Sequence, residues 1–215
     1  MLIRSLLFPV LFLGALRAEI IDRIAVSIDN QVITESEILM QLRLAAFLNS
    51  EPFDSSPSAK RQAAERLIDQ KLMRKEMDAG HYLQPADSEV QAVLKQVQQQ
   101  RFSDQKDYQE ALRTYSITEQ DLKKYLGWQL AFLRFMDVRF RPGIGVSDDE
   151  IQARFNKERP HLHKEAGADN TDSLTDFRDR IEENLIERQV DEQASEWLAA
   201  ARKRARIEFR PEAFQ

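Results

Sequence analysis

Hydrophobic positions follow two different periods along the chain, with alternation at the ends and helical spacing between. Residues Ile20–Ile28 are rich in β-branched side chains, Asp29-Asn30 supplies a turn, and residues 31–33 are again mostly apolar. This pattern predicts a short hairpin. Basic and apolar residues alternate over Arg204–Arg210, which is typical of an edge strand. We expect that strand to pair with the hairpin and so to bring the chain ends together.

The segments between these ends carry apolar residues at helical spacing. Residues with the pattern of a capping box open three of the predicted helices, at Thr34, Thr118 and Ser147. Gly80 is predicted to end the second helix in a left-handed conformation. The pattern predicts helices over residues 35–48, 58–79, 85–102, 104–114, 118–140 and 147–158, and a last one of almost thirty residues that includes 177–201.

Composition agrees with a mostly helical protein and excludes several chemistries. The chain has 215 residues with 31 basic and 36 acidic side chains, a formal charge of −5, and only 6 Gly and 7 Pro. It has no cysteine, which excludes disulfides, a thiol nucleophile and a zinc site built on thiolates. The acidic balance argues against nucleic acid as a partner.

The first residues have the pattern of a secretory signal peptide. One basic residue, Arg4, precedes the apolar run Leu6–Leu16, and Ala18 is a small residue at the expected break. The run is shorter than the roughly 20 apolar residues that a membrane span needs. We therefore expect residues 1–18 to be removed on export, without stable membrane insertion afterwards. An uncleaved membrane anchor is the alternative.

No cluster of residues predicts catalysis or a cofactor. His161 and His163 lie near Glu165, but their spacing is loose and no further ligand is evident, so we predict no metal site. His81 follows a helix end and is expected to interact with that end. Neither a nucleophile elbow nor a phosphate-binding glycine loop is present in the sequence.

The predicted helix over residues 118–140 is apolar on more than one side. Such a helix is normally buried in a core, and the alternative is that some of its aromatic side chains line a groove. We expect Leu126 and Leu133 to point inward, with Trp128 or Phe135 at the groove. Methionines can adapt to varied partners, so those near this helix join the candidates. The candidate peptide-binding residues are Met73, Met77, Tyr125, Trp128, Phe132, Phe135 and Met136.

Several segments, in this order, resemble the SurA-type periplasmic chaperones. They are the hairpin and capped helix of residues 21–38, then 66–72, 116–118, 146–151 and the closing 187–209. The resemblance implies a mostly α fold, the peptide-binding helical domain shared by SurA and trigger factor. A small sheet would pair the N-terminal hairpin with the C-terminal strand. It also implies a periplasmic location.

The chain departs from that family at one place. Members usually carry a parvulin prolyl-isomerase domain after the helix that begins near Val146, but here only residues 159–173 occupy the interval. Fewer than about 40 residues rarely fold alone without disulfides or metal. The predicted division is a signal peptide (1–18), a chaperone core (19–158), a linker in place of the parvulin domain (159–173), and a helix and strand that complete the core (174–215).

The resemblance therefore implies a chaperone that is not an enzyme. It would bind unfolded outer-membrane or secreted proteins through an apolar groove, without ATP, without prolyl isomerisation and without a cofactor. Two alternatives remain open at this point. One is an assembly or structural factor dedicated to a single partner, and the other is a degenerate prolyl isomerase.

Overall fold

A three-stranded antiparallel sheet joins the two ends of the described chain. The computed structural model describes residues 22–166 and 174–215, so the expected signal peptide lies outside the described residues. Strand β1 (Ile24–Ile28) lies in the middle, between β2 (Gln31–Thr34) and β3 (Ile207–Phe209). The predicted pairing of the C-terminal strand with the N-terminal hairpin is confirmed, with Val26 opposite Phe209.

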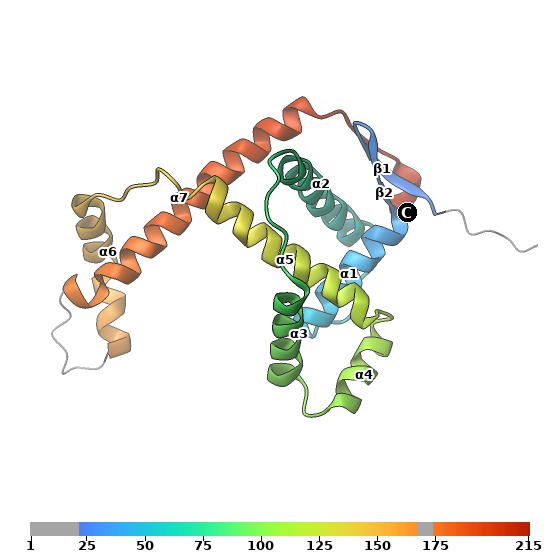
Figure 1. Ribbon diagram of the computed structural model, residues 1–215, viewed down its shortest axis with the longest axis horizontal. Helices are drawn as coiled ribbons and strands as arrows, with labels where there is room; N and C mark the ends of the chain where they lie inside the picture. The colour runs from blue at the N-terminus through green and yellow to red at the C-terminus, as the bar shows by residue number, and fades with distance from the viewer. Residues whose placement is uncertain (1–21, 167–173) are drawn as a thin grey trace, which may run out of the picture.

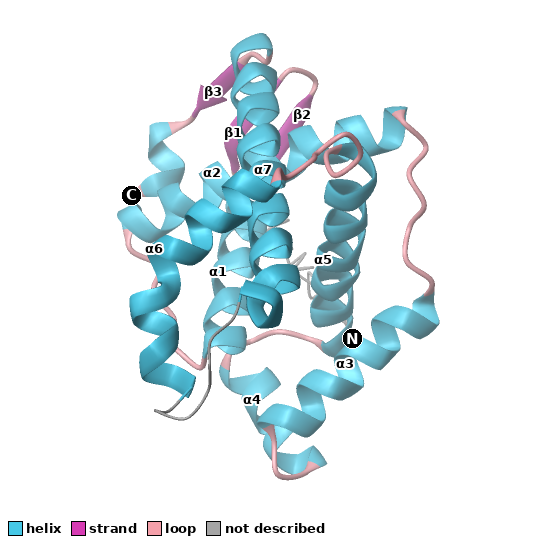
Figure 2. Ribbon diagram, turned by 90° about the vertical axis from the view of Figure 1, so that its left-hand side faces the viewer, coloured by secondary structure: helices cyan, strands magenta, loops and turns pink. Residues whose placement is uncertain are grey.

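Helices make up most of the rest of the described chain. Figure 1 shows α6 and the first half of α7 projecting to one side, while the sheet lies at the other end of α7. Figure 2 shows α3 and α4 at the end of the molecule opposite the strands. The helices are α1 (Glu35–Asn49), α2 (Pro57–Ala79), α3 (Asp87–Arg101), α4 (Gln105–Thr114), α5 (Glu119–Arg139), α6 (Asp148–Ala166) and α7 (Leu174–Arg204), followed by the short 3₁₀ helix η1 (Pro211–Phe214).

The predicted capping boxes set the starts of three helices. The Thr34 hydroxyl accepts the backbone N–H of Glu37, whose carboxylate accepts the N–H of Thr34 in return. Thr118 and Asp121 make the same exchange at α5. Ser147 and Glu150 make it at α6. Each exchange satisfies backbone donors that the first turn of a helix otherwise leaves free.

Two apolar clusters pack around α1. The first lies between the sheet, α1, α2, the end of α7 and η1, and includes Val26, Ile38, Ile68 and Ala213. Its members come from both ends of the described chain, so folding must close a long loop before this cluster forms. The second cluster lies between α1, α3, α4 and α5. The second cluster fixes the N-terminal half of α5 against α1 and α3.

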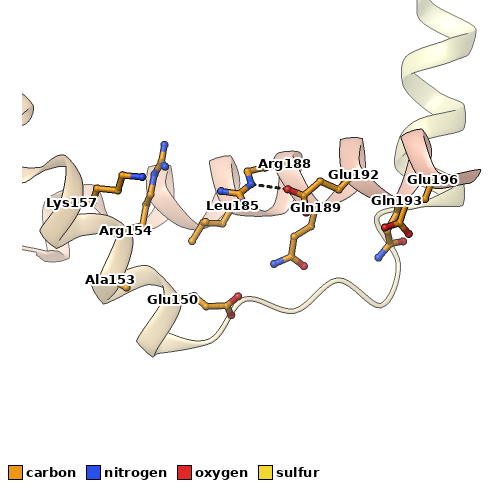
Figure 3. A pocket seen from close by; sticks show the side chains of 10 residues that line it. All are labelled: Glu150, Ala153, Arg154, Lys157, Leu185, Arg188, Gln189, Glu192, Gln193 and Glu196. Atoms are coloured by element: carbon orange, nitrogen blue, oxygen red, sulfur yellow. Dashed lines mark hydrogen bonds and ion pairs between the residues drawn. The ribbon is translucent and has the colours of Figure 1, made fainter. Parts of the chain in front are cut away.

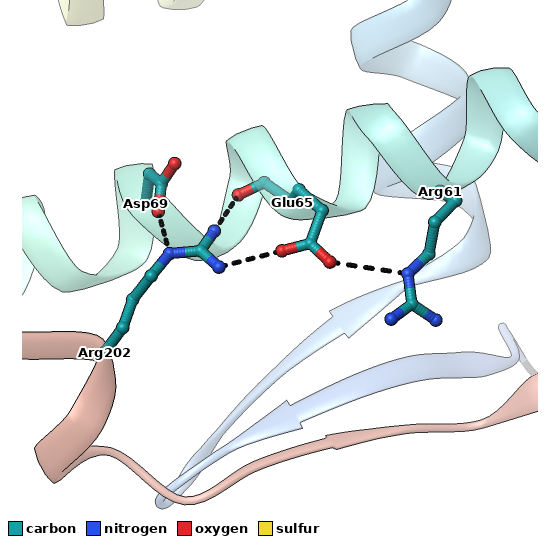
Figure 4. Close-up of polar contacts among 4 residues, drawn as sticks. All are labelled: Arg61, Glu65, Asp69 and Arg202. Atoms are coloured by element: carbon teal, nitrogen blue, oxygen red, sulfur yellow. Dashed lines mark hydrogen bonds and ion pairs between the residues drawn. The ribbon is translucent and has the colours of Figure 1, made fainter. Parts of the chain in front are cut away.

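Polar contacts fix the C-terminal half of α7 to α2. Figure 4 shows the Arg202 guanidinium between two acidic side chains of α2. Its Nε lies 2.5 Å from Asp69 Oδ1, its Nη1 lies 2.9 Å from Glu65 Oε2, and its Nη2 donates to the Glu65 carbonyl. Glu65 also lies 3.4 Å from Arg61 Nε, one turn earlier. The charges therefore set the register of α7 on α2.

Two details of the sequence prediction are wrong. Helix α6 continues to Ala166 rather than ending at residue 158, so the predicted linker over 159–173 begins too early. Proline removes one backbone donor and crowds the preceding turn, but residues 161–166 after it contain the good helix formers Leu, Lys, Glu and Ala. The residues between α6 and α7 are 167–173, which lie outside the described residues.

The second correction concerns the end of α2. Gly80 has φ −86°, and the left-handed residue is His81 with φ 53°. Glycine is needed at position 80 for a different reason, because a Cβ there would lie 2.4 Å from Tyr82 Cε2. The absence of a side chain at Gly80 thus lets the Tyr82 ring fold back over the helix end.

Candidate functional site

Six of the seven predicted binding residues meet in one apolar cluster between α2, α5 and α7. Three of them are buried and three are partly buried against them. Tyr125 lies apart, packed against the second cluster. The sequence prediction thus grouped residues that are close in space, although most of them face the interior. The six are Met73, Met77, Trp128, Phe132, Phe135 and Met136.

Phe135 is the centre of that cluster and is not on an open groove. Its ring lies 5.0 Å from Tyr82, 5.6 Å from Phe140 and 6.1 Å from Trp197, measured between ring centroids. Its exposed fraction is 0%, and Met77 is also buried. Aromatic rings at these separations stabilise a core beyond simple area burial. Of the two residues expected at a groove, Trp128 or Phe135, the second therefore lies in the core.

The expected inward direction of Leu133 is also wrong, whereas that of Leu126 is confirmed. Leu133 is 58% exposed and Leu126 is buried. Helix α5 faces α1 and α3 near its start, and α2 and α7 further along, so its buried side changes along its length. At 3.6 residues per turn, Leu133 lies about 200° around the helix from Phe135. Burial of Phe135 therefore places Leu133 in solvent.

An exposed apolar surface, the α5 patch, lies where the α2–α3 loop meets the C-terminal half of α5. We define it by Tyr82, Leu83, Leu133 and Val138. Leu83 and Val138 line a cavity of about 610 Å³ and are 84% and 63% exposed. Leu133 lies one turn before Asp137, which lines the same cavity. Apolar surface gathered in this way commonly marks an interaction site.

Sequence reasoning missed Leu83 and Val138. A usable signal existed for Leu83, since it is a large apolar residue in a segment that Gly80 and Pro85 mark as a loop. For Val138 the signal was weaker. It lies on the side of the helix that carries Arg134, one turn earlier, and polar neighbours one turn away indicate exposure.

A second cavity, the Gln41 cavity, lies between α1, α2 and α5 and holds about 230 Å³. Trp128 and Tyr125 contribute to it from α5, and the Arg74 guanidinium lies 4.3 Å from the Trp128 ring centroid. Of the predicted residues, these two aromatic side chains therefore have contact with a cavity. The lining is Glu37, Met40, Gln41, Leu44, Leu67, Gln70, Arg74, Asp121, Lys124, Tyr125 and Trp128.

A third cavity, between α6 and α7, is polar. Figure 3 shows charged and amide side chains from both helices around its volume of about 560 Å³. Much of its charge is already neutralised within each helix, with Arg188 Nε 2.9 Å from Glu192 Oε1 and Arg154 Nη2 2.5 Å from Glu158 Oε1. Such a lining does not offer the apolar contact that unfolded polypeptides need.

The residues that the structure describes show neither a metal cluster nor a membrane helix. Among them, no three His, Cys, Asp or Glu side chains lie close enough to hold a metal ion. The side chains of His161, His163 and Glu165 lie outside that description. Within the described part, none of the helices is both long and apolar enough to cross a membrane.

The observed fold, mostly helical with a small terminal sheet, agrees with the result of the comparison with protein families. A family model of the SurA-like N-terminal domain matches residues 5–136, which is more than half of the chain. The chain therefore belongs to the SurA-like N-terminal domain family, a chaperone-like periplasmic family. None of the curated proteins compared with the chain matches it.

The family's parvulin domain does not interrupt this chain between α6 and α7. Helix α6 ends at Ala166 and α7 begins at Leu174. The seven residues between them are far fewer than the roughly 40 that an independently folding domain needs. At this position only seven residues separate the end of α6 from the start of α7.

Proposed function

We propose that this protein is an exported, ATP-independent chaperone that holds unfolded outer-membrane or secreted polypeptides. The observation that carries the proposal is the α5 patch. Of the six exposed large apolar side chains among the described residues, Leu83 and Val138 line its cavity, and Leu133 lies one turn before Asp137 of the same lining. The family, with its periplasmic chaperone-like members, supports the same conclusion.

Physical chemistry explains why such a patch would serve unfolded clients. An unfolded β-protein exposes alternating apolar side chains and unpaired backbone groups, and it aggregates through both. Apolar contact needs no particular sequence, so one surface can cover many segments weakly and release them again. The net charge of −5 keeps the chaperone itself soluble while the patch stays exposed.

A light-scattering assay with a triple variant tests the proposal. Leu83→Gln, Leu133→Gln and Val138→Gln together replace exposed apolar groups by polar ones of similar size. We expect the triple variant to lose at least about half of the wild-type suppression of aggregation. The far-UV spectrum should not change, because exposed substitutions usually alter stability by less than about 0.5 kcal/mol.

Phe53→Gln is the matched control, because Phe53 is exposed and lies outside the patch. This variant should protect unfolded clients as the wild type does. Equal protection by the triple variant would contradict the assignment of the patch. If the wild type protected no unfolded protein but purified with one stoichiometric partner, the dedicated assembly factor would be the better description.

We further propose that the protein acts without prolyl isomerisation. The support is that too few residues lie between α6 and α7 for a parvulin domain. The same purified protein, added to a proline-containing peptide, should leave the rate of isomerisation at its uncatalysed value. Measurable turnover would favour the degenerate isomerase instead.

A further inference from the structure

Two polar side chains are buried in the described part of the protein, and they differ in their partners. Lys60 donates to Glu35 Oε1 at 2.9 Å and to the Gln215 carbonyl at 3.2 Å. Gln41 has an exposed fraction of 9% and makes no side-chain hydrogen bond to any residue that the structure describes. A buried amide without a partner lowers the stability of a protein, so native structures rarely keep one unless it has a use.

The Gln41 side chain lines the Gln41 cavity, where five of the other ten lining residues are apolar or aromatic. Leu44, Leu67 and Trp128 are buried there, and Met40 and Tyr125 complete the walls. The volume of about 230 Å³ lies below the roughly 300–1,000 Å³ of a typical small-molecule site. It suits one large side chain with its own peptide group. A glutamine amide both donates and accepts, as the peptide group does.

The acidic groups at the rim of the cavity are already engaged. Glu37 accepts the N–H of Thr34 at 2.9 Å, and its other oxygen lies 3.0 Å from Lys71 Nζ. Asp121 accepts the N–H and the hydroxyl of Thr118. Both carboxylates therefore act as helix caps, and Lys71 also neutralises the charge of Glu37.

The basic groups at the rim are not engaged in this way. Neither Arg74 nor Lys124 forms an ion pair with any side chain that the structure describes. The face of the Arg74 guanidinium lies over the Trp128 ring, which leaves its edge available for hydrogen bonds. Burial lowers the pKa of Arg74, an effect that the charge of Asp78 partly offsets, but a guanidinium stays charged in proteins. With Glu37 paired to Lys71, the remaining charges at the rim are those of Arg74 and Lys124 against that of Asp121, so their sum is positive.

We propose that the Gln41 cavity binds an extended client segment in which an acidic residue adjoins a large apolar one. The apolar side chain fills the cavity, the client's neighbouring peptide group bonds to the Gln41 amide, and the client's carboxylate faces Arg74 and Lys124. The inference rests on the proposed function, because it names which client segments are preferred. The proposed binding site is distinct from the α5 patch, since the Gln41 cavity and the patch lie on different sides of α5.

Fluorescence anisotropy with labelled peptides tests this preference. Three nine-residue peptides, blocked at both ends, carry a central Phe flanked by Asp, by Gln or by Lys. At low salt the full-length protein should bind the Asp peptide about fivefold more tightly than the Lys peptide. Arg74→Gln with Lys124→Gln should remove the difference. Lys95→Gln with Lys106→Gln, which changes two exposed lysines of α3 and α4, should leave it unchanged.

Gln41→Leu gives a second, independent readout. It should weaken the Asp peptide about five- to tenfold, because one hydrogen bond in a buried site is lost. It should also raise or preserve the Tm of the free protein, because it removes an unpaired buried amide. A purely structural role for Gln41 predicts the opposite, a fall in Tm. Gln96→Leu, at an exposed position of α3, is the control for the substitution itself.

Three results would contradict the assignment of the Gln41 cavity as a binding site. Equal binding of the Asp and Lys peptides, or wild-type binding by Gln41→Leu, overturns the cavity assignment. So does a dimer in the free wild type that Gln41→Leu dissociates, because a second copy would then be the occupant. Aggregation suppression with no peptide preference contradicts only the cavity, whereas peptide preference without aggregation suppression contradicts only the proposed chaperone function.

Discussion

Single residues decide how α7 is held against the body, and Arg202 is the clearest case. Its guanidinium bridges Asp69 and Glu65 and also reaches a backbone carbonyl, while its side chain is only 30% exposed. An exposed ion pair contributes about 0–1 kcal/mol, but an arginine that bridges several fixed acceptors contributes more. The contact joins residues that are more than 130 positions apart in sequence. It therefore holds the C-terminal helix against the N-terminal part of the described chain.

Arg202→Met should therefore lower the free energy of unfolding by about 1–2 kcal/mol. The methionine keeps most of the stem's packing but removes the cation that lies between Asp69 and Glu65, and Glu65 then keeps only its contact with Arg61. Urea unfolding followed by circular dichroism measures the loss. Arg188→Met is the control, because the pair of Arg188 with Glu192 is largely exposed, and a loss of equal size there would contradict this account.

At the scale of elements, the start of α3 is coupled to α5 through one carboxylate. Glu89 accepts the backbone N–H of Ala86 at 2.8 Å and also contacts Arg134 of α5. The hydrogen bond from Ala86, then the contact with Arg134, lowers the pKa of Glu89 below its ordinary value of 4.5. Since the folded pKa is the lower one, this stabilisation is present above pH 4.5 and is lost as pH falls through the folded value.

We expect Glu89→Gln to be less stable than the wild type at neutral pH, with the difference shrinking as pH falls below 4.5. The glutamine cannot pair with Arg134 and caps the helix less well. Urea midpoints of both proteins, measured at a series of pH values, check this expectation. A difference that stayed constant down to acid pH would show that Glu89 acts through packing rather than through its charge.

The elements themselves were largely readable from the sequence, because caps and periodicity are local. Thr34, Thr118 and Ser147 begin their helices as predicted, and the terminal strands pair as predicted. Which side of α5 is buried could not be read, since that side is set by partners distant in sequence. Leu133 and Phe135 have similar hydrophobicity, and only the positions of α2 and α7 separate them.

The Gln41 cavity depends even more on partners that are distant in sequence, so it could not be predicted from the sequence. Gln41 belongs to a helix whose pattern predicts an amphipathic element, and nothing local distinguishes it from an exposed glutamine. Its burial depends on α2 and α5, which pack over it from residues 67–74 and 121–128. The chemistry of that site is therefore a property of three helices together.

At the scale of the whole molecule, we expect α6 and the first half of α7, the arm, to be a separate stability unit. A small apolar cluster holds α6 to α7, with Ile151, Phe155 and Ile181 at its centre. None of its members belongs to the clusters of the body. Units with few buried contacts open at a lower free energy than the global unfolding of the protein.

Phe155→Ala should therefore loosen the arm and leave the body intact. Removing a buried Phe side chain typically costs about 3–5 kcal/mol, which exceeds what a cluster this small can supply. We expect amide hydrogen exchange over residues 148–158 to become faster, while β1, α1 and α2 keep their protection. Phe47→Ala, in the second cluster, is the contrasting variant, because that cluster ties α1 to α3, α4 and α5. If Phe155→Ala accelerated exchange equally in β1 and α2, the arm and the body would be one cooperative unit, and α7 would transmit unfolding along its whole length.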